Sequence, residues 1–400
     1  MKQNNALLIL TLGIFNALTP FSIDMYLSSF PSIAKDLGVP VAQMALSVSF
    51  YFIGFALGQV LYGPFLDRFG RKKPLYIGLA LYIVATFGCM TAQSFDALLL
   101  FRFLSALGGC AAGVAATTMV RDFFPPEQTA KVFSLLMLVL SVSPLLAPTI
   151  GSLLVAVASW RTIFAVLAGL GILNVFLLAT VIPNTYAPDE TVEIKLKPIL
   201  QNFKKVFLQP QFFTYTLAGS LGFAGLFVYV AASPAIFMEG FGLSAQGFGV
   251  VFGVLVFGMI GGGQVNLLMV KRHGERQVFK TFLTAEVIIS ALFLAGTATN
   301  TLGLYGTVAM MFVILFCVGA TYPNAAALAL EPFTSNVGSA SALLGFIQLG
   351  IGSIVSAGVG MLDMKGSLPT ALATFVASTL GLMLLLSRHK LHLSEKQLSS

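Results

Sequence analysis

Two charged side chains stand inside long apolar stretches of the chain, where a charge is costly. Asp24 is the single acid of the first stretch, and Arg102 lies within the fourth. A carboxyl group in such a place can bind and release a proton, and a nearby guanidinium group can change how tightly it does so. No nucleophile–base pair or metal-ligand set accompanies them, so the residues favour proton coupling, and neither an enzyme nor a metal or cofactor site is expected.

Depth in the membrane determines whether Asp24 and Arg102 can interact. Asp24 lies roughly 8 Å from the outer end of its span and Arg102 roughly 9 Å from the same surface, at about 1.5 Å per residue. Movement of Arg102 at this shared level would change the proton affinity of Asp24. We therefore expect Asp24 to be the coupling group and Arg102 to tune it. The alternatives are a permanent ion pair, or an Asp24 that only caps the outer turn.

A third group of charges forms a short turn between two apolar runs, from Gly63 to Pro74. The residues that carry its pattern are Gly63, Asp67, Arg68, Gly70, Arg71 and Lys72. Clustered cations cannot lie in hydrocarbon, so the turn must lie at a membrane surface, which the positive-inside bias makes the cytoplasmic one. Asp67 would bond this turn and a neighbouring helix end as a latch, or the turn would serve topology alone.

Composition places the whole chain in a bilayer. Of the 400 residues, 57% are hydrophobic and only 9% are charged, with a mean hydropathy of +0.92, whereas soluble domains carry about 25% charged residues. The net charge of +7 comes from residues in separate turns and forms no continuous face, so no nucleic-acid partner is expected. The three cysteines all lie in apolar runs and indicate neither a disulfide framework nor a metal site.

The apolar runs predict twelve transmembrane helices, since a span needs about 20 apolar residues and lipid admits no open sheet. The expected spans are residues 6–28, 42–66, 75–93, 96–119, 131–155, 160–182, 211–237, 246–270, 280–298, 301–325, 338–361 and 367–387. The longest polar stretch, 183–210, divides them evenly. We therefore predict a six-helix bundle in residues 1–182, a cytoplasmic linker in 183–210 and a second six-helix bundle in 211–400.

The distribution of Lys and Arg predicts the orientation. With the N-terminus inside, eighteen of the 22 basic residues fall on the inner side and three on the outer side, with Arg102 inside a span. Both termini are therefore expected in the cytoplasm.

The two halves also resemble each other in sequence. Pro31-Ser32-Ile33 corresponds to Pro234-Ala235-Ile236, and the turn at Gly70 corresponds to a weaker copy at 271–276 that has lost the acidic position. A six-span repeat in parallel orientation is typical of secondary transporters built from two bundles.

At these residues the chain resembles the major facilitator superfamily. The Gly63–Lys72 pattern matches the superfamily's loop motif G-x-x-x-D-R-x-G-R-[RK]-x, and the segment around Arg102 is similar to the fourth span of its drug:proton antiporters. Asp24-Met25-Tyr26-Leu27 looks like the bicyclomycin-resistance (Bcr/CflA) members of that branch. The resemblance implies the major facilitator fold, drug efflux exchanged for protons, and a bacterial inner-membrane location.

The fifth span carries a partial match to the antiporter motif of that branch. Pro148 and Gly151 occupy matching positions, and Pro144 is the further proline expected of the bicyclomycin-resistance members. Prolines inside a helix kink it and free backbone carbonyls. The motif therefore either acts in exchange or provides a packing kink alone.

The first span of each three-span unit lines the central cavity in this superfamily. By that resemblance the candidate substrate contacts are Asn16, Tyr26, Met137, Ser141, Phe223, Tyr229, Tyr305 and Asn324. This aromatic, weakly charged set suits a small amphipathic compound. Glu286, an acid inside a second-half span, is interpreted as a helix-end carboxylate that reaches for the membrane surface, with a second proton site as the alternative.

These observations predict a proton-coupled efflux antiporter for small amphipathic drugs. The expected partners are protons, the drugs and the lipid bilayer, and the chain is expected to be a monomer. A proton-coupled transporter of a small metabolite (an amino acid, peptide or sugar) is the first alternative, and a non-transporting membrane receptor or scaffold is the second. The lack of a G-x-x-x-x-G-K-[ST] sequence gives no reason to expect ATP as the direct driving force.

Overall fold

The computed structural model describes residues 2–183, 196–333, 337–362 and 366–398. Twelve segments of these ranges are helices long and apolar enough to cross a membrane, and the same ranges contain no β-strand. The predicted all-helical membrane fold is therefore confirmed. Residues 184–195 of the predicted linker lie outside the described ranges, and so do two of the basic residues counted for the orientation, Lys195 and Lys365.

The first half of the chain forms seven α-helices and two 3₁₀ turns. In order these are α1 (Lys2–Asp24), η1 (Leu27–Ser29), α2 (Phe30–Leu37), η2 (Val41–Met44), α3 (Ala45–Arg68), α4 (Lys72–Thr91), α5 (Phe95–Phe123), α6 (Pro126–Val157) and α7 (Arg161–Thr180). Asp24 is thus the last residue of α1, and the chain turns before α2.

The second half repeats this plan with one additional short helix. Its elements are α8 (Leu196–Phe207), α9 (Pro210–Pro234), the π-helical turn η3 (Ala235–Gly240), α10 (Ala245–His273), α11 (Glu275–Ala298), α12 (Leu304–Leu330), α13 (Val337–Met361) and α14 (Leu368–Leu398). Helix α8 lies inside the predicted linker, and its Val206 packs in a cluster with Phe212 of α9.

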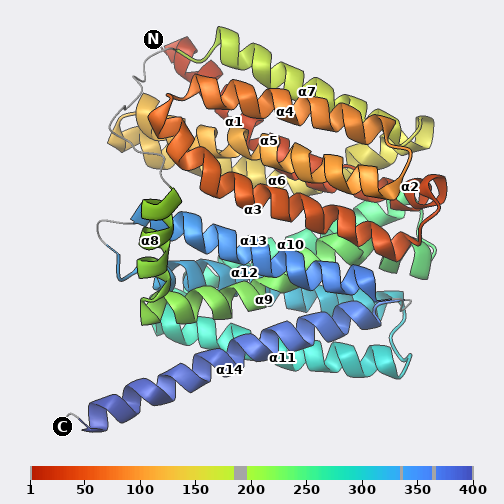
Figure 1. The fold of residues 1–400 in the computed structure, drawn as a ribbon. Coiled ribbons are helices and arrows are strands. Elements are labelled where there is room, and N and C mark those ends of the chain that lie inside the picture. Colours follow the sequence, from red (N-terminus) through yellow and green to blue (C-terminus); the bar gives the residue numbers. More distant parts are fainter. Residues whose placement is uncertain (1, 184–195, 334–336, 363–365, 399–400) are drawn as a thin grey trace. The chain divides into compact units, whose positions relative to one another are not determined.

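Internal contacts divide the chain into two compact units. Unit 1 comprises residues 1–196 with 244–250, and unit 2 comprises residues 197–243 with 251–400. In unit 1, α5 is the central helix: α1, α3 and α4 all pack on it, α1 also packs on α6, and α4 also packs on α7 (Figure 1). In unit 2, α9 packs on α12, α13 and α14, and α11 packs on α12 and α14.

Two glycines allow the tight turns that correspond in the two units. Gly70 joins α3 to α4 with φ 79°, and Gly274 joins α10 to α11 with φ 76°. This left-handed conformation is strained for residues with a Cβ atom. The predicted correspondence of these turns is therefore present in the backbone as well as in the sequence.

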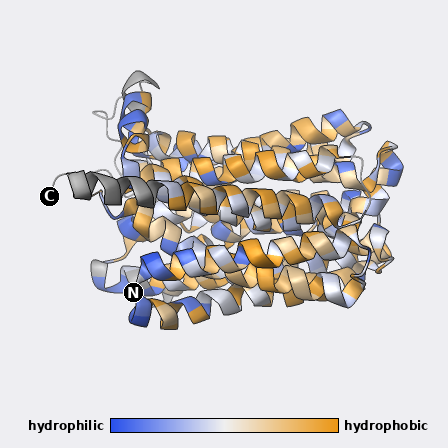
Figure 2. Cartoon of the chain, turned by 90° about the horizontal axis from the view of Figure 1, so that it is seen from below, coloured by the Kyte–Doolittle hydropathy of each residue, from blue (hydrophilic) through white to orange (hydrophobic). Residues whose placement is uncertain are grey.

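The helices expose apolar side chains along their length. Figure 2 shows hydrophobic residues along the helices and hydrophilic residues gathered near helix ends. Ile77, Val84 and Ile354 are each more than two-thirds exposed although they lie in the middle of helices. A soluble protein would bury such residues, so lipid is their natural surrounding.

Candidate functional site

Arg102 is the centre of a buried polar cluster in unit 1. Its side chain is 1% exposed, and its Nη1 donates a hydrogen bond of 2.9 Å to the carbonyl oxygen of Ser22. The guanidinium carbon lies 4.1 Å from the ring centre of Tyr26 and 4.2 Å from that of Tyr51. Within the described residues Arg102 has no carboxylate partner, so the two aromatic faces are its main electrostatic support.

Hydrogen bonds hold the residues around Arg102 in place. The hydroxyl groups of Ser22 and Tyr82 lie 2.7 Å apart and link α1 to α4. The hydroxyl groups of Tyr26 and Ser47 lie 2.9 Å apart and link the turn after α1 to α3. The cluster therefore ties three helices to α5 around one buried cation.

We predict that Arg102→Lys lowers the stability of the protein by about 1–3 kcal/mol, because an ammonium group cannot stack flat between two rings. Thermal unfolding of the purified protein in detergent measures this. Tyr51→Phe is the matched control, since it keeps the ring face and should change stability less. An Arg102→Lys protein as stable as the parent would contradict the stacking account.

Asp24 is two residues after Ser22, whose carbonyl accepts the bond from Arg102, but its carboxyl group does not pair with Arg102. The carboxyl group is 4% exposed and forms no ion pair or hydrogen bond with the described residues. Ser22, on α1, faces Arg102, and Asp24 is two residues further along the same helix, roughly 200° around it. The alternative of a permanent Asp24–Arg102 ion pair is therefore absent from this arrangement, whereas the tuning of Asp24 by Arg102 stays a prediction.

The charged turn of unit 1 forms a network with the end of α5. Arg71 donates from Nε to Asp122 Oδ2 at 2.7 Å, from Nη2 to Asp122 Oδ1 at 3.3 Å, and from Nη1 to Asp67 Oδ1 at 2.7 Å. The side chains of Arg71 and Asp122 are 8% and 17% exposed, whereas Asp67 is 49% exposed. The two-pronged bond to Asp122 is therefore the stronger half of the network.

The other residues of the turn contribute less contact. Gly70 supplies the turn, and Arg68 and Lys72 are partly exposed. A Cβ atom added to Gly63 would meet nothing within 4 Å, so close packing does not require glycine there. Asp122 was not among the predicted site residues. The signal that could have found it is its place at the end of the fourth span, because the charged turn has several cations and only one acid, Asp67.

The corresponding turn of unit 2 keeps a weaker form of this bridge. Arg276 lies 3.4 Å from Glu331 at the end of α12, and the two side chains are 65% and 58% exposed. Exposed single bonds of this kind contribute little to stability. The two turns are therefore unequal in structure.

Helix α6 contains the partial antiporter motif and packs against the turn that follows Asp24. The helix is continuous from Pro126 to Val157, with Pro144 and Pro148 inside it. A Cβ atom on Gly151 would overlap the carbonyl oxygen of Met25 and lie 2.9 Å from Ser28 Oγ. Glycine at this position thus lets α6 lie directly on the backbone beside Asp24.

We predict that Gly151→Ala destabilises the protein by about 1–3 kcal/mol through overpacking, and lowers transport because the turn after Asp24 must move. Thermal unfolding and a transport assay measure the two effects. Gly169→Ala on α7 is the matched control, because a Cβ atom there meets nothing within 4 Å. If both substitutions behave alike, the close approach of α6 is unimportant.

Four of the predicted substrate contacts are engaged inside their own unit. Asn16 donates to the carbonyl of Leu136 at 3.2 Å, Tyr26 stacks on Arg102, Tyr229 donates to the carbonyl of Phe252 at 3.2 Å, and Asn324 donates to Asn266 Oδ1 at 2.6 Å. Such bonds position helices.

The other four differ among themselves in exposure. Met137 and Tyr305 are 51% and 87% exposed, and Ser141 is also exposed, with its hydroxyl donating to the Met137 carbonyl at 2.9 Å. Phe223 packs its ring 4.5 Å from that of Tyr322. Within neither unit do the eight residues form a single site.

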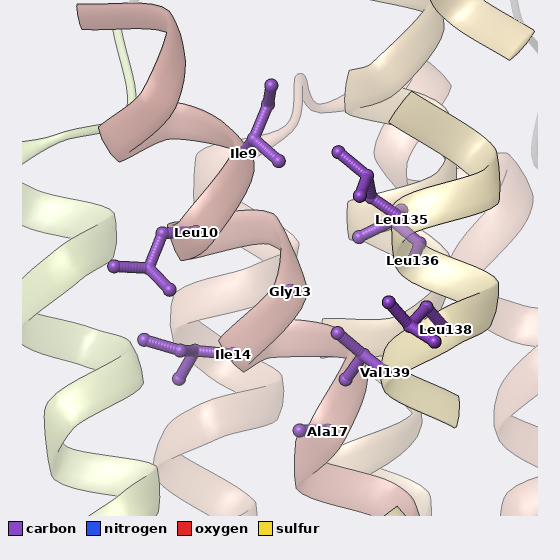
Figure 3. A pocket seen from close by; sticks show the side chains of 9 residues that line it. All are labelled: Ile9, Leu10, Gly13, Ile14, Ala17, Leu135, Leu136, Leu138 and Val139. Atoms are coloured by element: carbon purple, nitrogen blue, oxygen red, sulfur yellow. The ribbon is translucent and has the colours of Figure 1, made fainter. Parts of the chain in front are cut away.

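An apolar groove lies between α1 and α6 of unit 1 (Figure 3). Its volume is about 300 Å³, and it is lined by Ile9, Leu10, Gly13, Ile14, Ala17, Leu135, Leu136, Leu138 and Val139. Every lining residue is apolar, so the groove suits a hydrophobic group and offers no side chain that would hold a charge.

The interpretation of Glu286 as a helix-end carboxylate is wrong. Helix α11 begins at Glu275 rather than at the predicted residue 280, so Glu286 lies at the middle of the helix. Its side chain is 1% exposed, and both carboxyl oxygens lack a hydrogen-bond partner among the described residues. A side chain buried at mid-helix cannot reach a membrane surface.

Comparison with known proteins gives a consistent result. The sequence profile of the Major Facilitator Superfamily matches residues 12–357. The chain is 32% identical over 394 residues to the bicyclomycin resistance protein homolog of Haemophilus influenzae, covering 97% of this chain and 98% of that protein. It is 27% identical over 340 residues to the multidrug resistance protein MdtL of Klebsiella pneumoniae, covering 83% of each.

Solved structures match in fold. The nucleoside transporter NupG aligns with a TM-score of 0.72 at 16% identity, over 95% of this chain and 98% of that one. A D-xylose-proton symporter aligns with a TM-score of 0.71 at 15% identity, over 94% of this chain and 96% of that one. At such identities the likeness concerns the fold alone.

Proposed function

The chain belongs to the major facilitator superfamily, and on this premise we propose that it is an efflux transporter that exchanges small amphipathic drugs for protons. Relatives named for bicyclomycin resistance and multidrug resistance align with most of its length and support the drug substrates. The proposed location is the bacterial inner membrane, with both termini in the cytoplasm and the protein acting as a monomer. The proposed domains are the bundles 1–182 and 211–400 joined by the linker 183–210.

The observation that carries the proton coupling is the state of Asp24. A carboxyl group at the end of a membrane helix, 4% exposed and without an ion pair among the described residues, has nothing to hold it permanently charged. The protonated carboxyl group is neutral and can stay buried. The ionised carboxylate needs a cation, a hydrogen-bond donor or water beside it. A drug that binds beside the ionised form would therefore compete with the proton.

Arg102 has a positioning role in this proposal. It holds Ser22 of α1 and Tyr26 of the following turn against α5, and so fixes the direction in which Asp24 projects. Gly151 of α6 packs on the same turn from another side. Movement of α1 or α6 during transport would change the surroundings of Asp24 without breaking a direct Arg102–Asp24 bond.

The network of Arg71, Asp67 and Asp122 is proposed to act as a latch on the cytoplasmic side of unit 1. It joins the α3–α4 turn to the end of α5 by charged hydrogen bonds, most of them shielded from solvent. Such bonds have directional geometry and are lost as a group when a helix end moves. The latch thus favours one arrangement of the two helix ends.

Drug export is tested by transport into proteoliposomes that hold the purified full chain. A panel containing bicyclomycin and hydrophobic dyes is supplied outside, with the inside acidified relative to the outside. Drugs should accumulate against their gradient, and an uncoupler should abolish the accumulation. If instead a sugar, amino acid or peptide accumulates and no drug does, the metabolite-transporter alternative is correct; a pH gradient that moves none of these compounds would contradict proton-coupled transport.

A further inference from the structure

Glu286 of α11 is a second buried carboxyl group that the account above does not use. Its helix packs on α12 and α14 of unit 2 (Figure 1), and α9 approaches the carboxyl group through two glycines. A Cβ atom added to Gly222 would lie 3.4 Å from Glu286 Oε2, and one added to Gly225 would lie 3.8 Å from Oε1. These two glycines, about one turn apart on α9, leave the room that the carboxyl group occupies.

The carboxyl group is polar, buried and unsatisfied. Its side chain is 1% exposed, and neither oxygen has a hydrogen-bond partner among the described residues. Buried polar groups with a purely structural role are almost always hydrogen-bonded. A Leu or Met side chain would fill this space without the cost of burying a carboxyl group, so packing does not explain an acid here.

Side-chain hydroxyl groups lie on the helices that pack around Glu286. Ser290 is one turn further along α11, Thr307 is near the start of α12, and Thr370 is near the start of α14. All three are at most 2% exposed, and their hydroxyl oxygens also lack partners among the described residues. Hydroxyl groups can pass on a proton because each is both donor and acceptor.

A small cavity in unit 2 is lined by one of these hydroxyl residues, Thr370. It has a volume of about 10 Å³ and is lined by Gly225 and Tyr229 of α9, Thr370 and Thr374 of α14, and apolar side chains of α11 and α12. This is about the space that one water molecule requires. Gly225, which touches the cavity, also faces Glu286 Oε1. Gly225 therefore lies between Glu286 and a space on the side of unit 2 at which α14 begins.

The internal repeat shows what stands at the same place in unit 1. Glu286 is twelve residues after Gly274, as Tyr82 is twelve after Gly70. Gly225 is nine residues before Pro234, as Ser22 is nine before Pro31. The Tyr82–Ser22 hydrogen bond of unit 1 is therefore replaced in unit 2 by a carboxyl group beside a glycine.

The cation of unit 1 is replaced as well. Arg102 is 20 residues before Asp122, and Met311 is 20 residues before Glu331. Asp122 and Glu331 occupy equivalent places, since each pairs with an arginine beside the preceding turn. Unit 2 thus has an acid where unit 1 has a hydrogen-bonded tyrosine, and an apolar side chain where unit 1 has its buried cation.

No charged group from the packed helices reaches Glu286 within the described part of the chain. The titratable side chains are Tyr215 and Tyr229 on α9, Tyr305, Cys317 and Tyr322 on α12, and Glu275, Arg276 and Lys280 in the first two turns of α11; α14 has none before residue 388. Of these, Cys317 is the group close enough to interact electrostatically with Glu286. A neutral thiol cannot stabilise a carboxylate charge as a cation would.

We propose that Glu286 is a second proton-binding site, which carries a proton through the same transport cycle in which Asp24 exchanges drug for proton. A hydronium ion gives a proton to the carboxylate: one O–H bond of hydronium breaks, an O–H bond forms on Glu286, and a water molecule and a neutral carboxylic acid result. On the other side the carboxylic O–H bond breaks and the proton forms an O–H bond with water, which restores hydronium and the carboxylate. This inference rests on the proposed function, and it predicts two protons exchanged for each drug molecule.

The number of protons can be measured in proteoliposomes at zero membrane potential. A gradient of one pH unit is imposed, and the opposing gradient of a neutral drug from the exported panel is varied until net drug flux is zero. For each proton exchanged per drug molecule, one pH unit offsets a drug concentration ratio of about ten. The parent protein should balance at about a hundredfold gradient, and Glu286→Gln at about tenfold, with Asp24 intact in both.

Two further variants separate proton binding from packing. Glu286→Met removes the carboxyl group but keeps the side-chain length, and it should also balance at about a tenfold drug gradient. Glu286→Asp keeps a carboxyl group and should retain the balance point of the parent. If the parent and the Gln and Met variants all balance at the same gradient, the Glu286 site is refuted while the proposed function stands. If the parent's balance point does not respond to the pH gradient, the proposed function itself is refuted.

Discussion

Replacing Asp24 with asparagine is expected to reduce pH-driven drug accumulation to the level of vesicles without protein. Asparagine is close in size to aspartate but cannot lose a proton, so it mimics the neutral carboxyl group permanently. The side chain is 4% exposed and unpaired among the described residues, so the substitution removes no ion pair. The loss would therefore reflect chemistry, and proteoliposomes with an imposed pH gradient measure it directly.

A matched variant distinguishes loss of the carboxyl group from local misfolding. Asp24→Glu keeps a titratable group one methylene further out and should retain part of the accumulation. Asp24→Asn should unfold at the temperature of the parent protein, because burying a neutral amide is no costlier than burying a carboxyl group. Accumulation that survives in Asp24→Asn would place the coupling group elsewhere in the chain.

The second large effect is expected at Asp122. Asp122→Asn should destabilise the protein by about 2–3 kcal/mol, because it weakens two charge-assisted hydrogen bonds to a buried arginine. Asp67→Asn should cost less than about 1 kcal/mol, because that carboxylate is 49% exposed and its pair is screened by solvent. Thermal unfolding of both variants measures the difference, and transport should decline in the same order if the network is a latch.

The comparison of these two variants includes its own control. Both remove one negative charge from the same end of unit 1, so a general effect of charge on insertion would affect them alike. Glu331→Gln in the corresponding exposed bridge of unit 2 should change stability little. An Asp67→Asn effect equal to that of Asp122→Asn would contradict the ranking by burial.

The sequence predicted the helices well because bilayer thickness sets their length. Twelve apolar runs separated by charged turns leave little freedom once each run must satisfy its backbone in lipid. Helix ends were less certain. Glu275 and Arg276 are polar but helical, so hydropathy started the ninth span several residues late and placed Glu286 near a surface.

The site was harder to predict than the fold because direction around a helix matters as much as depth. Counting residues predicts a shared level for Asp24 and Arg102, yet a helix turns by about 100° per residue, and it is Ser22 of α1 that bonds Arg102. Asp122 was missed as a latch residue because its partner Arg71 is 51 residues away in sequence. The helices that bury Glu286 are distant from it in sequence, which no local pattern reveals.

The central claim is that drug and proton compete at Asp24, and proton release on drug binding tests it most directly. Purified protein in weakly buffered detergent solution is mixed with an exported drug while the pH is followed. The parent protein should release protons in proportion to the drug bound, and Asp24→Asn should release none on drug addition. Equal release from both proteins, or drug binding to the parent without any release, would contradict the account.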